Sequence, residues 1–369
     1  MKIGYDIRSF LKEESGIGIY LKNLLKYILK KDRDNKYYLL SSSLKDRFDK
    51  TMLPSFENMK IKDFRVPVRT LNYLWYKLKF PPLGFFFLKK LDIVHSPVPS
   101  IIPGGRKKII TIHDTCFIDK PLLVMQESID YFKKDFIKSV KKADGIITIS
   151  EWTKSRILDI AGKEYEDKIE VIYHGSDFDN LTSKKPKFPL PERYLLFVGT
   201  IEPRKNILRM IKAMRIIIKE DKNLKLLIVG KKGWAYKEIL QYIAKSGIDE
   251  NIIITEYISR EELKYIYEKS LFLIFPSLYE GFGLPILESA YVEKPVIASD
   301  IQVFREIFSD FPVYFNPLSP EDMATAIKIL LSNNEIYKSK KRFALQLKKR
   351  LKLEYMAENT LNFYKRIAE

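Results

Sequence analysis

The sequence predicts an α/β protein made of two doubly wound domains, each a parallel sheet covered by helices. Short runs rich in β-branched residues alternate with longer amphipathic stretches along the whole chain, which is typical of this architecture. Several runs are apolar throughout, as strands buried on both faces of a parallel sheet are. The alternation occurs twice, and 369 residues exceed what one hydrophobic core usually serves.

The individual elements follow from this periodicity. In the first half the predicted strands are Lys2 to Ile7, Lys107 to Ile112, Gly145 to Ile149 and Lys168 to Tyr173, and the predicted helices are Gly18 to Lys31 and Glu127 to Lys142. In the second half the predicted strands are Tyr194 to Val198, Leu224 to Val229, Asn251 to Tyr257, Leu271 to Phe275 and Pro295 to Ala298, and the predicted helices are Asn206 to Lys219 and Glu321 to Leu331. Ligand-binding motifs are expected directly after such strands.

The periodicity fails between Asp177 and Glu192, where prolines and lysines gather. Such a stretch predicts an exposed linker. We therefore expect an N-terminal domain over residues 1–178, a linker over 179–192, a C-terminal domain over 193–350 and a final helical segment over 351–369. Two open sheets whose crevices face each other would form one cleft.

The chain is strongly basic, with a formal net charge of +18. Residues 1–180 hold 33 basic and 24 acidic side chains, and the rest of the chain holds 32 and 23. This even excess suits an anionic ligand, an anionic membrane surface or nucleic acid without choosing among them. A generally lysine-rich composition is the alternative explanation. Cys116 is the only cysteine, which excludes an intrachain disulfide and a cysteine-based zinc site.

No segment predicts export or a membrane span. The first residues lack the long apolar core of a secretory signal. The nearest apolar window, Phe80 to Leu88, is too short to cross a bilayer. We expect a cytoplasmic protein, with contact at the inner face of the cytoplasmic membrane as a further hypothesis.

The stretch YEGFGLPILE, residues 279–288, places two glutamates around a glycine-rich turn. On one continuous helix eight residues advance about 80° beyond two full turns, so Glu280 and Glu288 would not share a face. Gly281 and Gly283 allow a tight loop and Pro285 fits a first helical turn, so we expect the helix to begin near Gly283. Free N–H groups there suit an anion, and the carboxylates suit the hydroxyls of a sugar and a ribose. A simple turn with two solvated glutamates is the alternative.

The first strand of the second half ends in FVGTIEPRKNI, where Arg204 and Lys205 precede a predicted helix. Two cations before a helix N-terminus oppose the macrodipole, so an anion held between them would relieve the conflict. We interpret Arg204 and Lys205 as ligands of a diphosphate. Surface charge without a ligand is the alternative.

Two motifs of the first half carry less specific patterns. In ESGIGIY, Gly16 and Gly18 resemble the start of a dinucleotide fingerprint, but Leu21 replaces the third glycine. The pair permits close approach of a ligand to a helix start, and a helix-entry turn is the alternative.

In IITIHDT, His113 and Asp114 end a predicted strand. An imidazole at a strand end can make polar contacts with a ligand, and a core histidine is the alternative. His95 and His174 also close strands, without the spacing of zinc ligands.

The sequence lacks two motifs that would indicate other ways of binding a phosphate: a Walker loop and a metal-binding Asp-x-Asp pair. Residues 230–233 lack the spacing of a phosphate-binding Walker loop. The Asp-x-Asp pairs at residues 32–34 and 177–179 lie in a charged turn and at the linker, and neither suits a buried cation. We therefore expect no metal, and we expect cationic side chains and helix dipoles to stabilise a leaving diphosphate.

Taken together, these motifs resemble the retaining glycosyltransferases of family 4, which have the GT-B fold of two facing Rossmann-like domains. The resemblance rests on VGTIEPRKNI and SLYEGFGLPILE, with SGIGIY, TIHDT, ITISEWTKSRI and VIYHGSD upstream in the same order. It spans nearly the whole chain, and its E-x7-E motif is highly specific. The surrounding motifs look most like bacterial group 1 transferases, often mannosyltransferases, of surface polysaccharide synthesis.

The resemblance implies a donor-binding role for the C-terminal domain. Glu280 would hold hydroxyls of the donor sugar and Glu288 those of the ribose. The motif residues Phe282, Gly283 and Leu284 would lie beside the donor, the first two through their backbone N–H groups. Lys205 and Arg204 would neutralise the diphosphate. Thr200 stands where many relatives have an arginine, which would place more of this neutralisation on Arg204.

The resemblance also implies roles in the N-terminal domain, on the acceptor side. Gly16 and Gly18 would border the donor phosphates, and His113 would contact the donor sugar near its reacting face. Ser150 and Glu151 match a turn of the family without an assigned contact. The C-terminal helix, Leu353 to Ile367, would pack back onto this domain.

The implied reaction moves a sugar from a nucleotide diphosphate to an acceptor hydroxyl with retained configuration and without a bound metal. GDP-mannose is the donor expected from the resemblance, and UDP-sugars stay open. Domain closure would exclude water from the site.

The acceptor side has one unusual segment. Residues 69–90 mix Trp75 and other aromatic residues with basic ones, as a membrane-surface element would. Packing of an aromatic helix inside the domain is the alternative.

Three other functions compete with sugar transfer. A scaffold that binds a nucleotide or an acidic glycan without turnover would keep Lys205, Glu280 and Glu288. A nucleic-acid-binding protein would use the +18 charge, but no recognised module is present. A nicotinamide-dependent enzyme is disfavoured by Leu21 and by the lack of a ribose-binding acid after the second strand.

Overall fold

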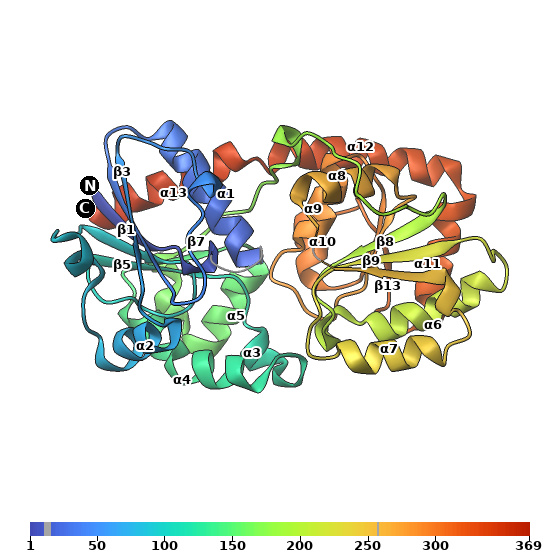
Figure 1. Cartoon of the computed structure of the whole chain (residues 1–369), viewed down its shortest axis with the longest axis horizontal. Coiled ribbons are helices and arrows are strands. Elements are labelled where there is room, and N and C mark those ends of the chain that lie inside the picture. Colours follow the sequence, from blue (N-terminus) through green and yellow to red (C-terminus); the bar gives the residue numbers. More distant parts are fainter. Residues whose placement is uncertain (11–15, 257) are drawn as a thin grey trace. The chain divides into compact units, whose positions relative to one another are not determined.

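The computed structural model describes residues 1–10, 16–256 and 258–369 (Figure 1). Ser15, the first residue of the SGIGIY motif, and Tyr257, the last residue of a predicted strand, lie outside these ranges. The chain divides into two compact units. Unit 1 comprises Met1–Ile118, Gln126–Gly175 and Lys352–Glu369, and unit 2 comprises Asp119–Met125 and Ser176–Leu351. Residues 179–192, the expected linker, thus fall within unit 2, and the final helical segment falls within unit 1 from Lys352 onward.

Unit 1 is built on a sheet of seven parallel strands in the order β3-β2-β1-β4-β5-β6-β7. The strands are β1 (Lys2–Asp6), β2 (Lys36–Ser42), β3 (Met59–Phe64), β4 (Ile93–Ser96), β5 (Lys107–Ile112), β6 (Gly145–Thr148) and β7 (Ile169–Val171). The strand predictions for this half are confirmed, with ends shifted by one or two residues. Strands β2, β3 and β4 are not predicted: β2 ends in two serines, the edge strand β3 includes three charged residues, and β4 is only four residues long.

The helices of unit 1 are α1 (Gly16–Lys31), α2 (Val68–Asn72), α3 (Cys116–Asp119), α4 (Gln126–Lys142), α5 (Glu151–Ala161) and α13 (Leu353–Ala368). Helices α1 and α13 lie side by side (Figure 1). Tyr364 of α13 hydrogen-bonds Tyr5 of β1, and its hydroxyl lies 2.5 Å from Nδ1 of His95 on β4. The last helix of the chain is therefore part of the core of the first domain.

Unit 2 is built on six parallel strands in the order β10-β9-β8-β11-β12-β13. The strands are β8 (Tyr194–Val198), β9 (Lys225–Val229), β10 (Ile252–Thr255), β11 (Leu273–Phe275), β12 (Val296–Ser299) and β13 (Val313–Phe315). All but β13 are predicted from the sequence. The core strands β8, β9 and β11 are almost completely buried, as continuously apolar runs require.

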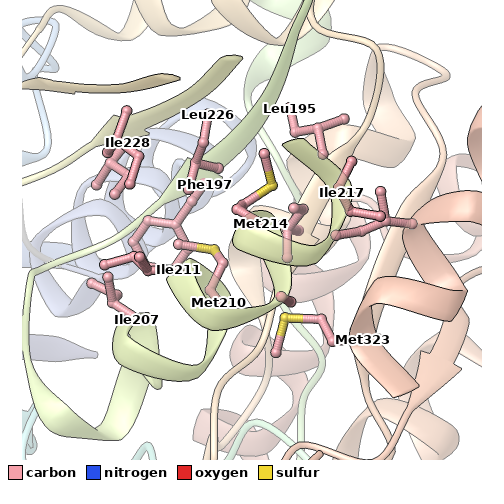
Figure 2. Close-up of a cluster of buried hydrophobic side chains, with 14 of the residues drawn as sticks. Leu195, Phe197, Ile207, Met210, Ile211, Met214, Ile217, Leu226, Ile228 and Met323 are labelled. Atoms are coloured by element: carbon pink, nitrogen blue, oxygen red, sulfur yellow. The ribbon is translucent and has the colours of Figure 1, made fainter. Parts of the chain in front are cut away.

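The helices of unit 2 cover both faces of this sheet (Figure 1). They are α6 (Ile207–Ile218), α7 (Tyr236–Ala244), α8 (Arg260–Lys269), α9 (Leu284–Tyr291), α10 (Gln302–Phe308), α11 (Pro320–Ser332) and α12 (Asn334–Arg350). Figure 2 shows Met210 and Met214 of α6 among the apolar side chains that pack against Phe197 of β8 and Met323 of α11. This dense core fixes the strand ends from which the polar loops project.

Each sheet has one point where the strand order reverses. In unit 1 this point lies between β1 and β4, and in unit 2 it lies between β8 and β11. Open α/β sheets bind ligands outside the carboxyl ends of the strands at such points. A ligand-binding site is therefore expected in the loops that follow β1, β4, β8 and β11.

Candidate functional site

The point where the strand order of unit 2 reverses, between β8 and β11, is its switch point. The loops that carry the two most informative motifs of the sequence meet there. A short 3₁₀ turn, Pro203–Lys205, follows β8, and residues 276–283 follow β11. The backbone N–H of Leu278 donates to the carbonyl of Arg204 at 2.8 Å. This bond ties the two loops together at the carboxyl edge of the sheet.

Arg204, Lys205 and Glu280 form an ion cluster in these loops. Nζ of Lys205 lies 2.5 Å from Oε1 of Glu280, and Nη1 of Arg204 lies 3.2 Å from Oε2. Arg204 also pairs with Glu202 at 2.8 Å. Lys205 and Glu280 are each only 8% exposed. The carboxylate of Glu280 is thus the anion that offsets the unfavourable position of Arg204 and Lys205 before the N-terminus of α6.

The charge of Glu280 is stabilised by this arrangement. Burial alone would raise the pKa of its carboxyl, but Lys205 and Arg204 outweigh burial and hold the pKa below its ordinary value. Glu280 is therefore a carboxylate at neutral pH. Its cationic partners are those that we expect to bind a diphosphate.

The backbone at Gly283 starts helix α9, as the sequence predicts. Gly283 is the N-cap residue, with φ of 107°, and Leu284 and Pro285 form the first turn. A Cβ atom at this position would lie 2.8 Å from the ring of Phe304. Phe282 is buried, and its ring packs against Phe308. The first N–H groups of a helix have no partner within the helix, so this end of α9 is suited to acceptor oxygens.

Glu288 lies in the middle of α9 and is 2% exposed. Its Oε1 accepts from Nη1 of Arg260 at 2.5 Å, and its Oε2 accepts from the hydroxyl of Tyr267 at 3.1 Å. Nη2 of Arg260 bonds Asp177. Burial raises the pKa of the Glu288 carboxyl, and Arg260 opposes this shift. The second glutamate is therefore held in a fixed orientation by residues that the sequence analysis does not single out.

The signal for Arg260 is present in the sequence. Arg260 is the first residue of α8, directly after the Ser259 cap, whose capping box is completed by Glu262. A cation at this position opposes the helix dipole, which is the same argument that singles out Arg204 and Lys205. What the sequence does not show is that α8 turns this side chain toward α9.

In unit 1, the predicted glycines lie at the start of α1. Gly16 is its first residue and Gly18 is buried in its first turn. A Cβ atom at Gly16 would meet no described atom within 4 Å. The backbone there is consequently open to close approach.

His113 directly follows β5 and lies near α1. The ring of Tyr20, from α1, stands edge-on to the His113 ring with a centroid distance of 4.8 Å. Nε2 of His113 lies 3.0 Å from the carbonyl oxygen of Pro97, which follows β4. Because a carbonyl only accepts, Nε2 carries the proton and Nδ1 carries the lone pair. Burial lowers the pKa of His113 to about 4, although the Pro97 carbonyl opposes the shift.

The other two histidines lie in the interior of unit 1. His95 is fully buried, and its Nε2 lies 2.7 Å from the hydroxyl of Thr111. Burial lowers its pKa to about 3. His174 is also buried and forms a hydrogen bond with the carbonyl of the adjacent Gly175.

Ser150, which matches a turn of the family, is the N-cap of α5: its hydroxyl accepts a hydrogen bond from the backbone N–H of Thr153.

The described part of the chain has neither a cluster of metal-binding side chains nor a helix that could span a membrane. Within these residues, no three His, Cys, Asp or Glu side chains gather as a metal-ion site would require. No helix among them combines the length and apolar character needed to cross a membrane.

Comparison with known proteins identifies the family. Residues 179–350 match the model described as "Glycosyl transferases group 1", and residues 15–180 match the one described as "Glycosyltransferase Family 4". The two matches together cover nearly the whole chain. The chain is a family 4 glycosyltransferase.

This glycosyltransferase resembles named bacterial enzymes. It is 32% identical over 227 residues to the O-antigen chain mannosyltransferase RfbU of Salmonella typhimurium, and the match covers 62% of each chain. It is 26% identical over 283 residues to O-antigen chain mannosyltransferase B of Escherichia coli, with 74% of each chain covered. The chain therefore spans somewhat less than two thirds of the Salmonella relative.

Solved structures confirm the GT-B fold class of this glycosyltransferase. Sucrose-phosphate synthase from Thermosynechococcus elongatus superposes with a TM-score of 0.79 at 15% identity, covering 99% of this chain and 98% of that one. HepE of Anabaena in complex with UDP-glucose superposes with a TM-score of 0.75 at 16% identity, covering 99% and 100%. The expectation of two doubly wound parallel-sheet domains is confirmed.

Proposed function

We propose that this glycosyltransferase moves a hexose from a nucleotide-diphosphate donor to a hydroxyl of a glycan or lipid-linked glycan, with retained configuration and without a metal. The ion cluster of Arg204, Lys205 and Glu280 at the β8–β11 switch point carries this proposal. Charged side chains are costly to bury, and this edge of the sheet is where ligands bind.

The donor contacts follow from the chemistry of each group. Lys205 and Arg204 supply the positive charge that a departing diphosphate needs. Glu280 accepts hydrogen bonds from hydroxyls of the sugar once the diphosphate has replaced it as the partner of Lys205 and Arg204. Glu288 accepts hydroxyls of the ribose. The backbone of Phe282, Gly283 and Leu284 borders the donor at the start of α9.

Three residues of unit 1 complete the proposal. Gly16 and Gly18 approach the phosphates through open backbone at the start of α1. His113 contacts the donor sugar as a neutral ring, with Nδ1 as the acceptor, because its Nε2–H is directed at Pro97.

For the sugar, we propose mannose from GDP-mannose and a role in surface polysaccharide synthesis. The support is the name of the two relatives, both of which are O-antigen mannosyltransferases. UDP-glucose is the competing donor, because HepE was solved with it. The two donors differ in base and in sugar, so one panel separates them.

The test is a thermal-shift panel of GDP-mannose, UDP-glucose and other nucleotide sugars. A ligand at about 100 times its Kd should stabilise the protein by about 2.7 kcal/mol. Lys205→Ala should abolish the shift, and Lys212→Ala, an exposed lysine on α6, should not. Slow hydrolysis of the donor would then distinguish an enzyme from a binding protein. Hydrolysis that a chelator leaves unchanged would support the absence of a metal. Binding of no nucleotide sugar would refute the proposal.

A further inference from the structure

Residues 68–90 of unit 1 form a compact segment with two different faces. Helix α2 leads into a helical turn at Tyr73–Leu78, and a 3₁₀ turn follows at Leu83–Phe87. The inner face joins a hydrophobic cluster of β2 and β4. Trp75 is completely buried there, and its Nε1–H donates to the carbonyl of Pro81 at 2.9 Å. Core packing therefore explains the inner aromatic residues of this segment.

The same segment also exposes large apolar side chains, which core packing does not explain. Five large apolar side chains are exposed: Tyr73 by 55%, Leu78 by 56%, Phe80 by 60%, Phe85 by 57% and Leu88 by 83%. The rings of Phe80 and Phe85 contact each other at a centroid distance of 6.3 Å. We call these five side chains the Phe80 surface. Grouped exposed apolar side chains of this size indicate an interaction site.

Basic residues are interspersed in the sequence with the side chains of the Phe80 surface. Arg69, Lys77, Lys79, Lys89 and Lys90 are all exposed, and residues 69–90 include no acidic residue. Lys138 and Lys142 of α4 act electrostatically on Lys79 from the neighbouring helix, together with Asp135. Lys79 therefore faces two lysines and one acidic residue of α4, and the basic character of this region rests on the segment itself.

We propose that the Phe80 surface docks unit 1 on an anionic lipid bilayer. Leucine and phenylalanine side chains enter the boundary between headgroups and acyl chains, and the surrounding lysines meet the negative headgroups. The exposed leucine side chains favour a bilayer over a nucleic acid, because a bilayer offers an apolar interior beside its anionic headgroups. The buried Trp75 gives the outer side chains a rigid base. This proposal does not depend on the proposed sugar transfer.

The segment is also connected to the edge of the sheet where ligands bind. The guanidinium of Arg8, just after β1, lies over the Trp75 ring at 4.9 Å, and its Nη1 donates to Asn72 of α2 at 2.8 Å. Asp6, the last residue of β1, holds the same arginine at 2.6 Å. Docking through the Phe80 surface would therefore bring the β1 end of the switch point close to the bilayer surface.

Two substitutions test the proposal without disturbing the fold. Lys79 and Leu88 both have positive φ, 56° and 52°, where asparagine is tolerated better than most residues. Lys79→Asn removes a charge and Leu88→Asn removes an apolar group. The matched controls are Lys212→Gln and Leu318→Asn in unit 2, where Leu318 is 63% exposed. Thermal unfolding and nucleotide binding report on folding of all four variants.

The experiment is co-sedimentation with vesicles of phosphatidylcholine, with or without phosphatidylglycerol. The protein should sediment with the anionic vesicles only, and less at high salt. Lys79→Asn should weaken this partitioning about fivefold and Leu88→Asn about tenfold, while the controls change nothing. The proposal is overturned if no vesicle binds, if the controls and test variants behave alike, or if a DNA duplex displaces the protein from the vesicles.

Discussion

Lys205 and Glu280 form a buried ion pair, 2.5 Å between Nζ and Oε1, at the switch point of the C-terminal sheet. A donor diphosphate would compete with Glu280 for the same ammonium group. The carboxylate therefore acts as an internal counterion that the ligand displaces, after which its oxygens can accept sugar hydroxyls.

This relationship predicts opposite effects of Glu280→Gln on two measurements. The free nucleoside diphosphate should bind about fivefold more tightly, because the amide no longer competes for Lys205 and Arg204. Sugar transfer should fall about 100-fold, because a charged acceptor is lost in the transition state. Calorimetry with GDP and UDP checks the first effect and a transfer assay the second. Glu202→Gln is the control, and weaker diphosphate binding by Glu280→Gln would contradict the counterion role.

Arg260→Met should impair donor binding through Glu288. Removing Arg260 leaves the buried carboxylates of Glu288 and Asp177 unbalanced, at a cost of about 3 kcal/mol in the free energy of unfolding. Arg260 lowers the pKa of Glu288 against burial, whereas Asp177 raises it. Without Arg260 the pKa of Glu288 rises further, so the carboxylate forms only at higher pH.

The KM for the donor should therefore increase at least about tenfold at pH 7 in this variant and fall again as the pH is raised. Arg260→Lys should retain part of the wild-type behaviour, because it keeps the charge. A KM that is raised equally at all pH values would show that Arg260 is needed only for packing.

His113→Gln should lower kcat/KM by about 100-fold if the neutral ring contacts the donor. Because the pKa of His113 is lowered to about 4, its titration should leave no inflection in the wild-type rate between pH 6 and 8. A rate profile with an inflection in that range that disappears in His113→Gln would contradict the neutral-ring assignment.

Stability should decrease as the pH falls from 7 to 5, with His95 as one cause. Burial lowers its pKa to about 3 from an ordinary value of 6.5. Below pH 6.5 the unfolded chain takes up a proton that the folded chain excludes, so the free energy of unfolding falls by about 2 kcal/mol at pH 5 from this residue alone. Urea unfolding of the wild type and of His95→Gln at both pH values checks this. Equal pH slopes for the two proteins would contradict it.

Gly283→Ala should destabilise unit 2 by more than a positive φ alone explains. Gly247 also has positive φ, 72°, but a Cβ atom there meets nothing described within 4 Å. Gly247→Ala should therefore cost about 1 kcal/mol from backbone strain, and Gly283→Ala about 3 kcal/mol, because its Cβ also meets Phe304. Equal thermal shifts for the two variants would show that Phe304 moves aside.

Periodicity was sufficient to predict most of the sheets, because the central strands are apolar on both faces. It does not predict β2, β3, β4 or β13, which are short or include polar and charged residues among the apolar ones. Local motifs also predict the start of α9 at Gly283 and the position of Arg204 and Lys205 before α6. In contrast, the pairing of Glu288 with Arg260 depends on how α8 packs against α9, which no local pattern describes. The same holds for the division of residues 69–90 into a buried and an exposed face.

The position of α13 has a consequence for biosynthesis. Tyr364 completes a buried hydrogen-bond network with Tyr5 and His95, so the first domain contains a residue that is translated after the whole of the second. The strands of the first domain therefore stay uncovered by α13 until the chain has been synthesised up to residue 368. Nascent chains stalled before α13 should therefore depend on chaperones more than the finished protein does.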